Sequence, residues 1–82
     1  MNSKPIHVLL IEDNPGDVRL LRELLDNTGA GAFVVAQVDR LAAGMEHLDA
    51  RAIDVILLDL SLPDSQGTET LIKTHAAAHG IP

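Results

Sequence analysis

The sequence predicts an α/β fold in which parallel strands alternate with helices. Two short apolar runs, residues 6–11 and 53–58, are nearly continuous, rich in β-branched residues, and followed by acids. Such runs are typical of parallel strands that are covered on both faces. Helical patterns follow each run, so the expected order is strand and helix in alternation, three times over. That order implies one parallel sheet with right-handed crossovers.

The first helix is expected directly after the first strand. Asn14 is a favourable N-cap, Pro15 suits the first helical position, and Asp17 falls in the first turn. Apolar residues then recur at spacings of three and four and predict one inward stripe. The stripe comprises Val18, Leu21, Leu24, Leu25 and Thr28, and Gly29 is the expected stop.

A weaker strand at residues 33–38 and a second helix at roughly 40–50 come next. Asp39 is the expected cap of this helix. Its inward-facing residues are predicted to be Leu41, Met45 and Leu48.

The third helix is expected at roughly residues 66–79, after the strand at 53–58. Its inward residues are predicted to be Leu71, Ile72 and Ala76, and Gly80 should end it. The last two residues, 81–82, could begin a fourth strand.

Composition narrows the classes of function. The 82 residues permit one domain, residues 1–82, and the net charge of −6 argues against a nucleic-acid partner for this segment. Absence of cysteine excludes disulfides and thiolate chemistry. No signal peptide opens the sequence and no apolar run approaches the ~20 residues that span a bilayer, so we expect a cytoplasmic chain without a membrane partner.

Acidic residues follow two strands that should be neighbours. Ligands of open α/β sheets bind beyond the carboxyl ends of the strands, and strands one and three are adjacent in the flavodoxin-like order. Glu12 and Asp13 follow strand one and Asp59 follows strand three, so three carboxylates should meet in one crevice. They would repel one another without a cation, and Mg²⁺ is a hard cation that prefers such oxygen ligands.

The segments around these acids resemble those of bacterial two-component receiver domains. Residues 9–15 are similar to the first strand and acidic turn of that family, and residues 55–67 are similar to its phosphorylation strand and loop. The family has Pro four residues after the acceptor Asp and Gly eight residues after it, which Pro63 and Gly67 match. The resemblance implies a flavodoxin-like, doubly wound sheet of order 2-1-3.

The resemblance also implies a function and a site. Asp59 would accept a phosphoryl group from a histidine kinase or phosphotransfer protein, so the chain would be a signalling module and not an enzyme. Mg²⁺ would be held by Glu12, Asp13, Asp59 and the backbone carbonyl of Ser61. The Ser61 side chain would face the site.

The family fold has five strands and five helices, and the sequence matches its first two-thirds. We therefore expect a receiver that lacks strands and helices four and five, together with the hydroxyl residue and the Lys that end strands four and five. Residues 53–58 would then form an unpaired apolar edge. We expect that the chain either self-associates through this edge or is part of a longer protein.

Three alternatives stay open. The chain could be a degenerate receiver that binds partners through this edge without phosphorylation. It could be a phosphohydrolase or nucleotide-binding domain, although residues 12–17 lack the glycine-rich phosphate-loop pattern. His75 and His79 have zinc-ligand spacing on a helix, but a solvated face explains them more simply.

Overall fold

Three parallel strands form the sheet of the computed structural model, which describes residues 5–27, 31–50, 52–78 and 80–82. The strands β1 (Ile6–Ile11), β2 (Phe33–Val38) and β3 (Val55–Leu58) lie in the order β2-β1-β3. Both neighbours run parallel to β1, and Val8 is in register with Val35 of β2 and Val55 of β3. The predicted order 2-1-3 is therefore confirmed, with β3 starting two residues later than expected.

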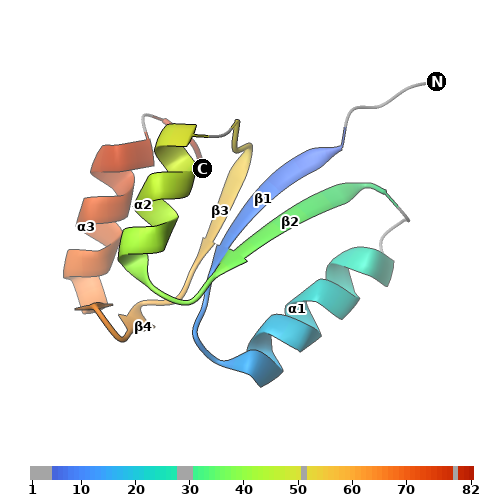
Figure 1. Cartoon of the computed structure of the whole chain (residues 1–82), viewed down its shortest axis with the longest axis horizontal. Coiled ribbons are helices and arrows are strands. Elements are labelled where there is room, and N and C mark those ends of the chain that lie inside the picture. Colours follow the sequence, from blue (N-terminus) through green and yellow to red (C-terminus); the bar gives the residue numbers. More distant parts are fainter. Residues whose placement is uncertain (1–4, 28–30, 51, 79) are drawn as a thin grey trace.

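Helices cover the two faces of this sheet unequally. As Figure 1 shows, α1 (Pro15–Asn27) lies on one side of the sheet, while α2 (Leu41–Ala50) and α3 (Gly67–Ala78) lie side by side on the other. Among the described residues, no helix is long and apolar enough to cross a membrane. The main core lies under α2 and α3, and its buried members are Leu9, Ile11, Leu41 and Leu62.

The start of α1 agrees with the prediction, but its inward-facing apolar stripe includes fewer residues than expected. The Asn14 side-chain oxygen accepts the N–H groups of Gly16 at 2.9 Å and Asp17 at 3.1 Å, which caps the helix. Three of the expected residues, Val18, Leu21 and Leu25, are half-buried.

Leu24 is 56% exposed, so its predicted inward position is wrong. At 3.6 residues per turn it lies roughly 90° from the centre of the stripe that Val18, Leu21 and Leu25 define. The predictions for Thr28 and Gly29 lie outside the described residues.

The core face of α2 is as predicted, but its cap is not. Leu41 is buried, and Met45 and Leu48 pack against the main core. The helix begins at Leu41, so the capping position falls to Arg40, which has no side-chain acceptor. The first two amides of the helix are instead bound by Asp64, which lies in a distant loop, and the prediction of Asp39 as the cap is wrong.

The predicted inward face of α3 is also wrong. Leu71 and Ile72 are 51% and 65% exposed and Ala76 is exposed, whereas the buried residues are Thr70, Thr74 and Ala78. The buried residues lie four apart and form one stripe of small side chains along α3.

The two ends of α3 lie close to the predicted positions. The helix runs from Gly67 to Ala78, and Gly80 has a φ of 92°, a left-handed conformation that suits a helix stop. His79 lies outside the described residues, so the pairing of His75 with His79 stays a hypothesis.

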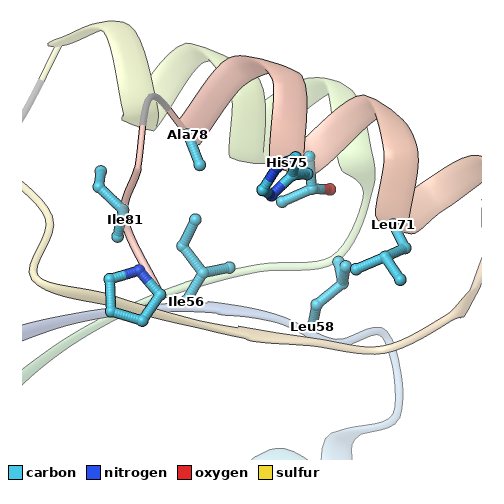
Figure 2. Close-up of a pocket in the computed structure, with 8 residues that line it drawn as sticks. Ile56, Leu58, Leu71, His75, Ala78 and Ile81 are labelled. Atoms are coloured by element: carbon cyan, nitrogen blue, oxygen red, sulfur yellow. The ribbon is translucent and has the colours of Figure 1, made fainter.

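The free side of β3 is partly occupied. Residues 81–82 form no strand, but the Ile56 N–H donates to the Pro82 carbonyl at 2.8 Å. The expectation of a fully unpaired edge is therefore wrong, because the last residue supplies one acceptor. Beside this contact an apolar groove of about 200 Å³ opens between β3 and α3. Figure 2 shows its wall, which includes Ile56, Leu58, Leu71, His75, Ala78 and Ile81.

Candidate functional site

Three carboxylates meet beyond the carboxyl end of the sheet. Glu12 and Asp13 follow β1, and Asp59 follows β3. Ile11 and Leu58, the last residues of these strands, are paired in register, so the acids begin at the same level. One oxygen from each carboxylate lies within 4.8 Å of the others. The structure therefore brings together the three side chains that the sequence singled out.

The backbone fixes two of these acids as continuations of the sheet. The Glu12 N–H donates to the Val38 carbonyl at 3.0 Å, and the Asp59 N–H donates to the Ile11 carbonyl at 2.9 Å. The Gln37 side chain also donates to the Glu12 carbonyl, at 3.0 Å. Because sheet bonds hold Glu12 and Asp59, their Cα positions are set by the strands and not by flexible turns.

The carboxylates of Glu12 and Asp59 repel each other. Burial raises the pKa of Glu12, and the neighbouring Asp59 carboxyl raises it further, although the Asn14 N–H bound to Glu12 acts in the opposite direction. Asp13 is exposed at the rim. A cation placed among the three would relieve the repulsion and favour the charged forms.

The spacing of the oxygens fits a small cation. Mg²⁺ binds oxygen at about 2.1 Å, so ligands on opposite sides of it lie roughly 4.2 Å apart. Oxygens within 4.8 Å of one another need only a small inward movement to reach this distance. Among the residues that the structure describes, no second group of three candidate ligands occurs.

An apolar surface adjoins the acids on the α1 side. A cavity of about 250 Å³ is lined there by Leu10, Leu21, Leu57 and Leu58, together with Glu12 and Asp59. Apolar walls reduce the hydration of a carboxylate, which is the physical cause of the burial effect on Glu12.

A short hairpin carries the loop after Asp59. The strands β4 (Ser61–Leu62) and β5 (Ser65–Gln66) pair antiparallel, so Pro63 and Asp64 form the turn. The Ser61 N–H donates to Asp59 Oδ1 at 2.9 Å, which orients the carboxylate. Ligation of a cation by the Ser61 carbonyl stays a prediction.

Sequence reasoning missed the contribution of Asp64. Its Oδ1 accepts the Leu41 N–H at 2.7 Å and its Oδ2 accepts the Ala42 N–H at 2.9 Å, and these bonds lower its pKa. The signal was indirect: a helix whose capping position is Arg40 needs an acceptor from elsewhere, and an acid in a neighbouring loop is the natural candidate.

Residues 8–82 match the family described as the response regulator receiver domain. The two-component response regulator ORR1 of Oryza sativa subsp. japonica is 38% identical over 92% of this chain and 36% of its own length. The transcriptional regulatory protein GlrR of Escherichia coli K12 is 28% identical over all of this chain and 18% of its own.

Solved structures of response regulators are similar to the fold of this chain. The phosphorylated cyanobacterial phytochrome response regulator RcpA has a TM-score of 0.82 and 32% identity, covering 95% of this chain and 61% of its own. The MaeR response regulator bound to beryllium trifluoride has a TM-score of 0.77 and 26% identity, covering 87% and 57%. The chain thus spans less than two thirds of these relatives.

Proposed function

The chain belongs to the response regulator receiver domain family, and from this premise we propose that Asp59 accepts a phosphoryl group from a histidine kinase or phosphotransfer protein with the help of Mg²⁺. The observation that carries the proposal is the convergence of Asp59 with Glu12 and Asp13 at one end of the sheet. Relatives add support, because similar structures hold a phosphoryl group or beryllium trifluoride.

The proposed transfer is a substitution at phosphorus. An Asp59 oxygen forms the new P–O bond while the P–N bond to the donor histidine breaks, and the imidazole nitrogen keeps the electron pair of that bond. The Ser61 N–H already fixes one Asp59 oxygen at 2.9 Å, which leaves the other to act as the nucleophile. In this role the chain is the substrate of a kinase, acting in the cytoplasm, and not an enzyme in its own right.

Glu12 and Asp13 are the proposed partners of the cation, together with Asp59 and the Ser61 carbonyl. When bound, Mg²⁺ neutralises charge on the phosphoryl oxygens. The three carboxylates suit it because a cation relieves their mutual repulsion. Burial, and to a lesser degree the Asp59 carboxyl, raises the pKa of Glu12, so a cation would also favour its charged form.

Phosphorylation is tested with acetyl phosphate and intact-mass measurement. Wild type should gain one phosphoryl group in the presence of Mg²⁺ and none with a chelator. Asp59→Asn should abolish the gain, whereas Asp49→Asn, at an exposed position on α2, should leave it unchanged. Labelling that persists in Asp59→Asn would assign the acceptor to another residue.

Cation binding is tested by calorimetric titration with Mg²⁺. Asp13→Ala should weaken binding at least about tenfold, since loss of even an outer-shell partner has that effect. Equal affinities of wild type and Asp13→Ala would remove Asp13 from the ligand set.

A second candidate function is supported by the edge of the sheet. β3 is an outer strand, and Leu71, which is 51% exposed, lines the apolar groove beside it. A phosphorylation-independent interaction module would associate through this edge. Association measured by sedimentation should then persist in Asp59→Asn and fall in Ile56→Lys or Val55→Lys. A wild-type chain that stays monomeric across the concentration range would rule this candidate out.

A further inference from the structure

The loop that follows the phosphoacceptor is fastened to a helix that is distant in sequence. Asp64, at the hairpin turn, places one carboxylate oxygen on each of the first two amides of α2, at 2.7 and 2.9 Å. These amides have no intrahelical acceptor, and α2 has no acid of its own in the first turn. Asp64 therefore supplies what the local sequence of α2 lacks.

The contact continues into the core beneath it. Leu62, two residues before Asp64, is 1% exposed and belongs to the same buried cluster as Leu41, the first residue of α2. The hairpin thus meets the start of α2 twice, through a carboxylate at the surface and through apolar side chains below.

Two further bonds close the loop. The Gly67 N–H donates to the Leu60 carbonyl at 2.5 Å, and the buried Thr70 hydroxyl donates to the Ser65 hydroxyl at 2.7 Å. Both bonds join the loop to itself or to α3. Of the hydrogen bonds between residues that the structure describes, those of Asp64 tie the tip of the hairpin to α2.

We propose that Asp64 is a positioning residue, which holds the backbone at Ser61 in register with Asp59 by anchoring the hairpin tip to α2. Ser61 lies on the first strand of the same hairpin, two residues before the turn and paired with Gln66, and its N–H donates to Asp59 at 2.9 Å. Displacement of the tip therefore reaches the acceptor through one short hairpin. The consequence for cation binding rests on the proposed function, whereas the consequence for the Ser61 amide does not.

Asp54 offers a matched control. Its Oδ2 also accepts a backbone amide, the His7 N–H, at 2.8 Å. This bond lies at the opposite end of the sheet, before β3 and near the start of β1. Asp64→Ala and Asp54→Ala remove the same kind of bond, and only the first removes it from the acceptor loop.

Two measurements on the whole chain test the proposal. Hydrogen exchange of the Ser61 amide, followed by NMR, should accelerate in Asp64→Ala and stay unchanged in Asp54→Ala when both are measured well below their unfolding temperatures. Titration with Mg²⁺ should show about tenfold weaker binding in Asp64→Ala, the size of effect that supporting partners of metal ligands have. Asp64→Asn, which keeps one acceptor oxygen, should fall between wild type and Asp64→Ala.

The two measurements test the role of Asp64 separately from the proposed phosphorylation, on which the Mg²⁺ result depends. A wild-type chain that binds no Mg²⁺ would overturn the proposed function, and the Ser61 exchange rate would still decide the role of Asp64. Unchanged Ser61 exchange in Asp64→Ala, or an equal increase in Asp54→Ala, would show that Asp64 contributes only general stability.

Discussion

Two loops meet at the acidic site, and the fold holds them by different means. The acceptor loop, residues 59–67, is tied down by tertiary contacts: Leu62 is buried in the main core and Asp64 binds α2. In the acidic turn, residues 12–14, tertiary bonds reach only the Glu12 backbone, through the Val38 carbonyl and the Gln37 side chain. The Glu12 side chain and the rest of the turn are held by short-range bonds, in which Asn14 donates to Glu12 and caps α1. The helix that follows this turn has no buried residue among those described.

The difference suits the two tasks proposed for the loops. A nucleophile must be aligned with its target, and small misplacements are expensive in rate, so a rigid attachment is favourable for Asp59. Side chains that ligate a cation adjust around it, so the Asp13 position and the Glu12 side chain tolerate local attachment. Rigidity is therefore concentrated on the α2 and α3 side of the sheet.

The strongest test of this asymmetry is a pair of truncations. Leu62→Ala removes a side chain that is 1% exposed in the main core, whereas Leu20→Ala removes one that is 56% exposed on α1. We expect the first to lower the free energy of unfolding by about 3 kcal/mol and the second by less than about 0.5 kcal/mol. Urea unfolding measures both. Similar losses for the two variants would show that α1 is as tightly packed as the acceptor loop.

A smaller loss of stability is expected from overpacking the core between the sheet and α2. A Cβ added at Gly44 of α2 would lie 2.5 Å from Ile11 Cδ1 and 3.7 Å from Val38 Cγ2. Ile11 is fully buried directly before the acidic turn, so it has little room to yield. Gly44→Ala should destabilise the fold by about 1–2 kcal/mol, because crowding outweighs the gain of about 1 kcal/mol in helix propensity.

Thermal and urea unfolding measure this effect, with Glu46→Ala at an exposed position on the same helix as the control. A net stabilisation by Gly44→Ala would mean that Ile11 repacks freely and that this side of the sheet is looser than its burial indicates.

The sequence predicted the elements that depend on local patterns. The strands at 6–11 and 33–38 and the capped start of α1 follow from apolar runs and from Asn14 and Pro15, whose effects act within a few residues. The meeting of Glu12, Asp13 and Asp59 was also predictable, because parallel strands bring their carboxyl ends to one edge.

The errors concern contacts that no local pattern encodes. The apolar pattern of α3 favoured Leu71 and Ile72 as inward residues, but the buried positions are Thr70 and Thr74. Asp39 lies next to α2 in sequence, yet Asp64 reaches its amides from a loop that only the tertiary fold brings near. Hydrophobicity alone does not reveal which face of a helix is buried.

The smallest predicted effect compares one carboxylate from each loop through pH. Hydrogen bonds from two amides lower the pKa of Asp64 below its ordinary value of 3.8, so its stabilisation is present above that value and is lost as the pH falls through the folded-state pKa. Burial raises the pKa of Glu12 above 4.5, so its ionisation weakens the fold as the pH rises through that range.

Asp64→Asn should therefore be less stable than wild type at neutral pH, and Glu12→Gln more stable when Mg²⁺ is absent. Both differences should shrink toward zero in acid, where wild type carries protons on these groups. Urea midpoints recorded with a chelator between about pH 3 and pH 7 measure the two profiles. If both variants changed stability in the same direction, the two carboxylates would be held in the same way. The contrast between the acceptor loop and the acidic turn would then be wrong.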